Sequence, residues 1–230
     1  MLEKAQRRFL DILASIYIYN EHRGYSSIDR VLEAVYVRHP GEKDFIAAVE
    51  KHRADERKHY LMFRRYFEGR GYMPYAVDKS CGHIDRLVSA TFGCGVDDLD
   101  PRAVIASDDL FFKLCRIIML TEMRGMHQLD APFFVRMIAS DPALVKIYAV
   151  IRRDEPSHWQ PYMTWLKAHG GTMPTFSERA ADFMTHRTLV YAKVPALFMN
   201  PRLPRRTSWQ DETDGEASLA PMEPAAVPAE

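Results

Sequence analysis

The stretch Arg152-Arg153-Asp154-Glu155-Pro156-Ser157-His158-Trp159 contains the pattern Asp-Glu-x-x-His. The same pattern occurs once more, at residues 55–59, where the chain reads Asp-Glu-Arg-Lys-His. On an α-helix, residues three positions apart lie on one face, so each copy directs a carboxylate and an imidazole toward the same point. Two such helices facing each other would bring two carboxylates and two imidazoles to a common centre.

Each motif has a further glutamate on the helix that precedes it. Glu21 lies 35 residues before Glu56, and the midpoint between them falls at a His-Pro-Gly turn signal. Glu122 lies 33 residues before Glu155, and this midpoint falls at a Ser-Asp-Pro stop and restart. In an antiparallel helix pair, residues equidistant from the turn sit at the same height. The sequence therefore predicts two helix hairpins, each of which carries one Glu followed by one Glu-x-x-His.

The apolar periodicity places these motifs on four long helices. We expect helices over about residues 3–38, 43–68, 107 to a kink at Pro132, and 142–169. Residues 70–106 form a long crossover with a short helix near residues 83–92, and a fifth helix spans about 177–199. Gly24 indicates either a bulge after Glu21 or a break into two helices. Residues 1–205 are expected to form one helical bundle domain, and residues 206–230 a disordered tail.

The glutamates interrupt helix faces that are otherwise apolar. Glu122, for example, is the only acid on the inner face of its helix. A buried carboxylate without a partner is costly or becomes protonated. Two divalent or trivalent cations would neutralise four such carboxylates. A mixed carboxylate and imidazole donor set favours iron, with manganese as the second choice.

This donor set resembles that of the ferritin-like di-iron or di-manganese carboxylate proteins. The resemblance covers roughly residues 5–170 and is carried by Glu21, Glu56, His59, Glu122, Glu155 and His158. It implies an all-α fold, namely a ferritin-like four-helix bundle with a long crossover and an additional C-terminal helix. We assign Glu21, Glu56 and His59 to one metal ion. The other ion takes Glu122, Glu155 and His158, and the resemblance makes Glu56 and Glu155 the bridging ligands.

Three further side chains near the motifs have two interpretations each. Asp55 and Asp154 fit a supporting role, in which each accepts a hydrogen bond from the ligand imidazole of the other hairpin. The alternative is that both form surface salt bridges with neighbouring arginines. His52 lies on the same helix face as Glu56, either as a core histidine or as a further ligand or supporting group.

Composition excludes several other classes of protein. The net charge is zero, which argues against a general nucleic-acid or acidic-membrane binder. The sequence contains no apolar run of 18 residues, so we expect no integral membrane segment. The charged N-terminus does not resemble a signal peptide. The three scattered cysteines favour a cytoplasmic location and argue against an attached rubredoxin-type iron site. A homodimer is a further expectation.

The doubled motif resembles the soluble acyl desaturases and bacterial multicomponent monooxygenases more than the storage ferritins. We therefore expect a di-iron oxidoreductase that activates dioxygen to oxidise or hydroxylate a small apolar or aromatic substrate, with an electron-donor protein as partner. Aromatic residues such as Phe63, Tyr148 and Trp159 are candidates to line its pocket. The chain departs from those enzymes at Gly125 and Met126, where they often carry a threonine. The alternatives are an iron-binding or iron-oxidising ferritin-like protein, or a metal-free interaction bundle.

Overall fold

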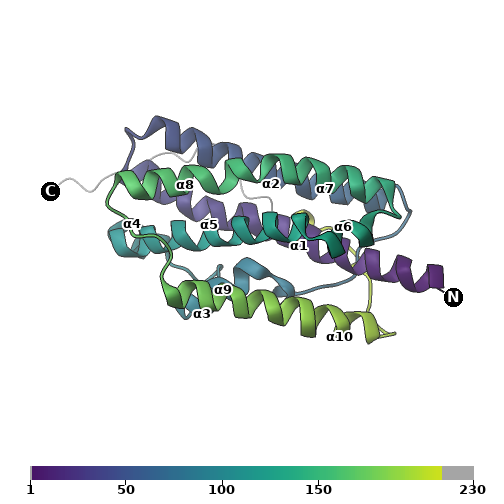
Figure 1. Ribbon diagram of the computed structural model, residues 1–230. Helices are drawn as coiled ribbons and strands as arrows, with labels where there is room; N and C mark the ends of the chain where they lie inside the picture. Colours follow the sequence, from purple (N-terminus) through teal and green to yellow (C-terminus); the bar gives the residue numbers. More distant parts are fainter. Residues whose placement is uncertain (1, 214–230) are drawn as a thin grey trace.

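The computed structural model describes residues 2–213, which form a bundle of helices aligned along one long axis (Figure 1). The long helical segments are α1 (Leu2–Arg38), α2 (Lys43–Glu68), α5 (Asp108–Asp130), and α7 (Pro142–Asp154) continued by α8 (Pro156–Ala168). Within the described residues there is no β-strand, only an isolated bridge between Tyr75 and Arg205. The predicted all-α class is confirmed, and no helix of these residues is long and apolar enough to cross a membrane.

The helix α1 continues through Gly24 without interruption, so the break that the sequence left open does not occur. One turn of this region is supported by Ser27, whose hydroxyl donates a hydrogen bond of 2.8 Å to the carbonyl of Gly24. The next helix, α2, has the bounds expected from the apolar pattern and packs along α1 as the second arm of the first hairpin.

Prolines divide the second hairpin into shorter helices. Pro132 separates α5 from α6 (Pro132–Ile138), as its missing N–H donor predicts. Pro156 is the first residue of α8, and Glu155 lies at the seam between α7 and α8 with helical backbone angles. The chain therefore keeps its direction across the seam, although the series of helical hydrogen bonds is interrupted there and begins again in α8.

The two hairpins are locked together at one end by Asp141. Its carboxylate caps α7 by accepting hydrogen bonds of 3.1 and 3.3 Å from the backbone N–H groups of Ala143 and Leu144. The same carboxylate accepts hydrogen bonds of 2.6 Å from both Arg7 and Arg70. This single buried side chain thus ties the start of α1 and the end of α2 to the start of α7.

The crossover carries the chain along the outside of the bundle. It contains the short helices η1 (Lys79–Cys81), α3 (His83–Phe92) and α4 (Pro101–Ala106), and α3 has the predicted bounds. The buried Asp85 of α3 accepts hydrogen bonds of 2.8 to 3.2 Å from Arg23 of α1. This ion pair fixes α3 against the first hairpin.

The segment predicted as a fifth helix covers α3 and one face of the bundle (Figure 1). It consists of α9 (Phe176–Thr188), a π-helical turn η2 (Leu189–Lys193) and α10 (Val194–Met199). Two ion pairs attach α9 to α5, since Arg116 donates to Glu178 and Arg124 donates to Asp182. Pro195 lacks the N–H group that would continue a regular helix from η2, which favours the wider π-helical turn before it.

The predicted disordered tail begins too early. Residues 206–213 are part of the described structure and include α11 (Gln210–Thr213). The carboxylate of Asp211 accepts hydrogen bonds of 2.6 Å from Tyr60 and 2.8 Å from Arg64, both on α2. Gln210 is 3% exposed, so this segment docks on the bundle despite its polar composition. The rest of the predicted tail, residues 214–230, lies outside the described residues.

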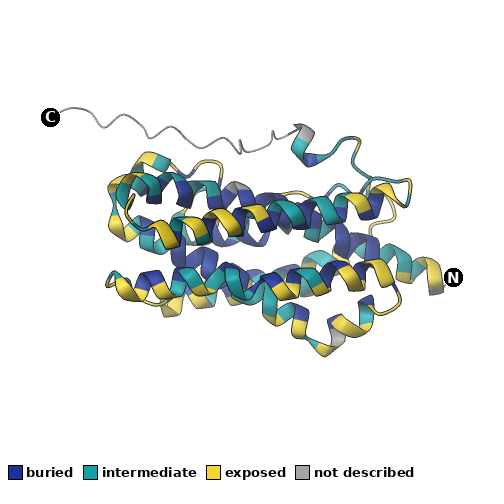
Figure 2. Ribbon diagram, turned by 90° about the horizontal axis from the view of Figure 1, so that it is seen from above, coloured by how far each residue is buried: buried dark blue, intermediate teal, exposed yellow. Residues whose placement is uncertain are grey.

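Buried residues line the inward faces of all the long helices (Figure 2). The apolar core is divided into two large clusters, one at each end of the bundle. One contains Ile28, Val49 and Leu114, and the other contains Leu10, Phe63 and Tyr148. Between these clusters the helices carry the glutamates and histidines that the sequence singled out, so any site formed by them is closed off by hydrocarbon at both ends.

Candidate metal centre

The six expected ligand residues come together inside the bundle from all four long segments. Glu21 lies on α1, Glu56 and His59 on α2, Glu122 on α5, Glu155 at the α7–α8 seam and His158 on α8. All six are buried, and none is more than 9% exposed. The ring centroids of the two motif histidines are 5.7 Å apart. The mirror arrangement deduced from the spacing of the motifs therefore corresponds to a real convergence of side chains.

One compact donor group consists of Glu21, Glu56 and His59. The Nδ1 atom of His59 lies 3.2 Å from Glu21 Oε2 and 3.9 Å from Glu56 Oε1. One donor atom from each of these three residues lies within 4.8 Å of the other two. Metal–nitrogen and metal–oxygen bonds of about 2 Å let one ion span donors up to about 4 Å apart, which covers both distances from His59. This group has the composition that the sequence assigned to the first ion.

A second compact group consists of His52, Glu56, Glu122 and His158. The Nδ1 atom of His158 lies 3.4 Å from Glu56 Oε1 and 3.8 Å from Glu122 Oε2. This grouping differs from the sequence-based assignment, because His52 and Glu56 join it and Glu155 does not. Glu155 remains at its edge, with Oε2 3.9 Å from His158 Nδ1. Glu56 belongs to both groups and so occupies the place expected of a bridging carboxylate.

The two motif histidines are each held by the aspartate of the opposite hairpin. His59 Nε2 lies 3.2 Å from Asp154, and His158 Nε2 lies 3.3 Å from Asp55, both at hydrogen-bond distance. With Nε2 protonated and donating, the lone pair of each ring is on Nδ1, the atom that faces the glutamates. The crossed contacts are those expected from the sequence.

The aspartates also form ion pairs, but with lysines more than with arginines. Lys58 donates to Asp154 at 2.7 Å and also pairs with Asp55, so one ammonium group bridges the two hairpins. Burial raises the pKa of each aspartate, yet hydrogen bonds from Lys58 and the facing histidine outweigh it and lower the pKa of Asp154 to about 2. The pKa of Asp55 also lies below its usual value, held there by His158 and the lysines against the effect of burial. Both carboxylates therefore remain charged acceptors for the imidazole N–H groups.

His52 was the residue that sequence reasoning left undecided. Its Nε2 atom lies 3.6 Å from Glu122 and 3.8 Å from Glu56, and has no hydrogen-bond partner. The other ring nitrogen, Nδ1, is 3.2 Å from the hydroxyl of Tyr162. Complete burial lowers the pKa of His52 to about 4, so the ring is neutral at pH 7 and offers a lone pair. In the sequence, the only indication of this role was that His52 lies one turn before Glu56 on the same helix face.

The carboxylates crowd each other when no cation lies between them. Burial and the charges of neighbouring glutamates raise the pKa of Glu56 and of Glu155 well above the usual value. Burial acts in the same direction on Glu122, but the nearby imidazoles of His52 and His158 lower its pKa overall. Protons on the first two carboxyls would therefore compete with metal ions for the centre.

Orphaned polar atoms indicate that the centre fits a pair of metal ions. Among the described residues, Glu155 Oε2, His158 Nδ1 and His52 Nε2 are buried without a hydrogen-bond partner. Buried polar atoms are rarely left in this state, because each unsatisfied atom costs free energy. All three atoms belong to carboxylate or imidazole groups that face the same space, and coordination would satisfy them together. The donor set, with four carboxylates and three imidazoles, suits iron or manganese.

Two glycines stand where helices approach the carboxylates most closely. A Cβ atom on Gly24 would lie 2.2 Å from Glu56 Oε2, which is far inside contact distance. A Cβ atom on Gly125 would lie 3.4 Å from Glu155 Oε1, which is an ordinary contact. Gly24 is therefore required for the observed position of the shared carboxylate, whereas Gly125 leaves room beside Glu155.

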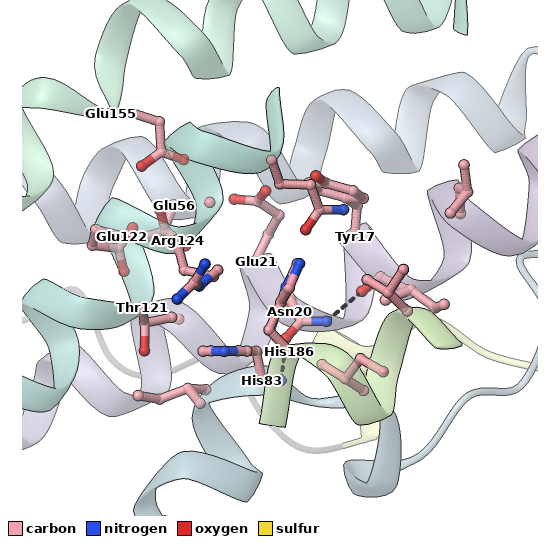
Figure 3. A pocket seen from close by; sticks show the side chains of 18 of the residues that line it. Tyr17, Asn20, Glu21, Glu56, His83, Thr121, Glu122, Arg124, Glu155 and His186 are labelled. Carbon is pink, nitrogen blue, oxygen red and sulfur yellow. Dashed lines mark hydrogen bonds between the residues drawn. The ribbon is translucent and has the colours of Figure 1, made fainter. Parts of the chain in front are cut away.

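A cavity of about 130 Å³ adjoins the carboxylates and extends toward the layer formed by α3, α9 and η2 (Figure 3). All four glutamates border it. Its other walls combine aliphatic side chains, among them Leu13, Ile16, Ile84, Leu189 and Val194, with Tyr17 and several polar side chains. The three aromatic residues expected from the sequence, Phe63, Tyr148 and Trp159, do not line this cavity, whereas Tyr17 does. Phe63 and Tyr148 pack instead in one core cluster and Trp159 packs against the other.

Comparisons of the chain with protein-family models, with curated proteins and with solved structures found no match, so the function is inferred from the centre itself.

Proposed function

We propose that the protein is a ferritin-like di-iron oxidoreductase that uses dioxygen to oxidise a small, largely apolar substrate. The observation that carries the proposal is the convergence of two Glu-x-x-His motifs and two further glutamates in one buried centre, with Glu56 common to both donor groups. This is the donor set of the ferritin-like carboxylate proteins, which bind two iron or two manganese ions.

The chain provides separate donors for each ion. Glu21 and His59 would hold one ion, and Glu122, His158 and His52 would hold the other. Glu56 belongs to both donor groups, and Glu155 would add its charge from the edge of the second group. Four carboxylates match the four positive charges of two divalent ions. When bound, a pair of ferrous ions supplies electrons for the reduction of dioxygen.

The surrounding residues prepare the centre for that chemistry. Asp55 and Asp154 fix the orientation of the two motif imidazoles and keep a proton on each Nε2 atom. The apolar clusters on both sides exclude water from the donors, which strengthens their interaction with cations. The cavity gives a substrate access to the carboxylate side of the centre, and its aliphatic walls favour a hydrocarbon over a polar molecule.

The proposal is tested by anaerobic titration of metal-free protein with Fe(II), followed by exposure to oxygen. We expect about two irons per chain and, after oxygen, the absorption band of an oxidised di-iron centre. Glu56→Ala should lose both ions, because both donor groups use this residue. Glu50→Ala is the matched control, since Glu50 is an exposed glutamate on the same helix.

Each alternative function has its own outcome in this titration. A chain that binds no iron and whose thermal stability is the same with and without metal would be an interaction bundle. A chain that oxidises many irons per molecule and releases or stores the product would be an iron-oxidising protein. Either result would overturn the proposed oxidoreductase.

A further inference from the structure

Polar side chains gather in the part of the cavity that faces away from the glutamates. They come from four elements: Arg124 and Gln128 from α5, Asn20 from α1, His83 from the start of α3, and His186 from α9. Figure 3 shows the side chains of Arg124, His83 and His186 lying between the glutamates and the outer helices. The same cavity has an apolar wall, to which Leu13, Ile16, Ile84 and Leu189 contribute. The cavity therefore combines polar side chains, an apolar wall and the glutamates of the candidate metal centre.

Arg124 is anchored along one edge only. Its Nε atom donates a hydrogen bond of 3.1 Å to Asp182, and its Nη2 atom donates to the same carboxylate. Among the described residues, its Nη1 atom makes no hydrogen bond, although the side chain borders the cavity and is only 26% exposed. A guanidinium carries five N–H donors in one plane. Arg124 is thus held rigidly by α9 while part of its donor fork remains available to a ligand.

The imidazole of His83 shares its carboxylate partner with Arg124. His83 is 9% exposed, and its Nδ1 atom has no hydrogen-bond partner within the described chain. Its Nε2 atom lies 3.2 Å from Asp182, the carboxylate that also holds Arg124. Asp182 is therefore occupied by two partners and does not itself line the cavity. A ligand that enters here meets the remaining edge of the Arg124 guanidinium.

We propose that the cavity binds a small monocarboxylic acid, with its carboxylate on Arg124 and its hydrocarbon part directed toward the metal centre. The planar fork of a guanidinium matches a carboxylate in shape and charge. One cation, already paired on its other edge, suits a single negative charge better than the two of a phosphate monoester. The aliphatic lining of the cavity suits an alkyl chain. Binding of the acid does not depend on the proposed function. The further claim that this acid is the substrate does rest on it.

The test compares straight-chain acids from butanoate to octanoate with the primary amides of the same lengths. Binding is measured by isothermal titration calorimetry to the zinc-loaded wild-type protein, which cannot react with oxygen. The best acid should bind about tenfold to a hundredfold more tightly than its amide, the usual range for a charge-assisted hydrogen bond. Equal affinity of acid and amide would overturn the proposal, as would a failure of every acid to bind.

Arg124→Gln should reduce the affinity for the acid to that of the amide, and Arg124→Lys should retain part of the difference. Arg116→Gln is the matched control, because Arg116 forms the equivalent ion pair between α5 and α9 but does not line the cavity. If Arg116→Gln also removes the difference in affinity between acid and amide, this difference depends on the position of α9 and not on a contact with Arg124. Thermal melts establish that each variant is folded, and the wild-type comparison stands without any variant.

Measuring iron binding alongside acid binding shows which of the two proposals has failed. A protein that binds and oxidises two irons but does not distinguish acids from amides would overturn the acid site alone. A protein that distinguishes them but binds no iron would overturn the oxidoreductase and leave the acid site in place.

Discussion

Replacing Gly24 with alanine should remove iron binding while leaving the fold intact. The added Cβ atom would lie 2.2 Å from Glu56 Oε2, so this oxygen must retreat by about 1.2 Å to reach the 3.4 Å of an ordinary contact. Metal–ligand distances tolerate only about 0.2 Å. Because Glu56 serves both donor groups, we expect the affinity for both ions to fall at least about a hundredfold, which corresponds to about 2.7 kcal/mol.

The free energy of unfolding of the metal-free Gly24→Ala protein should rise slightly or stay the same. An alanine inside a helix is about 1 kcal/mol more favourable than a glycine, and the displaced carboxylate of Glu56 offsets part of this gain. Iron binding is measured by anaerobic titration against a competing chelator, and stability by urea unfolding of metal-free protein.

Gly125→Ala provides the matched control, since it makes the same substitution inside α5 beside the same centre. Its Cβ atom would meet Glu155 at 3.4 Å, so we expect the helix-propensity gain with unchanged iron affinity. If Gly24→Ala binds two irons as tightly as the wild type does, the assignment of Glu56 as the shared ligand is refuted. If both variants lose iron equally, the close approach at Gly24 is not the cause.

Three further predictions concern single carboxylates. Burial and neighbouring carboxylates raise the pKa of Glu155, so in metal-free protein this group destabilises the fold above its unfolded pKa of about 4.3. Glu155→Gln should raise the metal-free melting temperature at pH 7 by a few degrees, lose this advantage below about pH 4, and reduce the melting-temperature gain from iron. Asp154→Asn removes the charged acceptor of His59 and should weaken iron binding about tenfold to a hundredfold in a chelator competition, while Asp211→Asn, in an ion pair away from the centre, should not. Burial raises the pKa of Asp141, but Arg7 and its other donors lower it overall, so its stabilisation is present above about pH 3.9 and is lost as the pH falls through the folded value. Asp141→Asn should cost about 2 kcal/mol in urea unfolding at pH 7 and progressively less as the pH falls below about 3.9, and a cost that does not fall would contradict this.

Helices and donor residues were predictable because both follow from spacing along one chain. The bounds of α2 and α3 follow from apolar periodicity and glycine signals, and the level of Glu21 against Glu56 follows from their equal distance from a turn. The crossed aspartate contacts follow from the same symmetry, since each motif places its aspartate next to its glutamate.

Features that depend on contacts between distant elements were not predictable. His52 can offer Nε2 to a metal ion because its Nδ1 atom contacts the hydroxyl of Tyr162 on α8. No local sequence pattern predicts that contact. The segment around Asp211 is polar in sequence but finds Tyr60 and Arg64 on α2. Leu189 and Val190 of η2 line the cavity, and the spacing of residues on the inner helices could not indicate this contribution. The ferritin-like topology itself remains a proposal.

The crossed hydrogen bonds mean that neither hairpin contains a complete half of the centre. Each imidazole depends on an aspartate from the other hairpin, so a lone hairpin could form this centre only by pairing with a second copy of itself about a two-fold axis. His52 breaks that symmetry, because the matching position one turn before Glu155 is Ile151. One ion would have an additional nitrogen donor that the other lacks. The two ions should therefore be spectroscopically inequivalent, and substituting His52 with isoleucine should make them more alike.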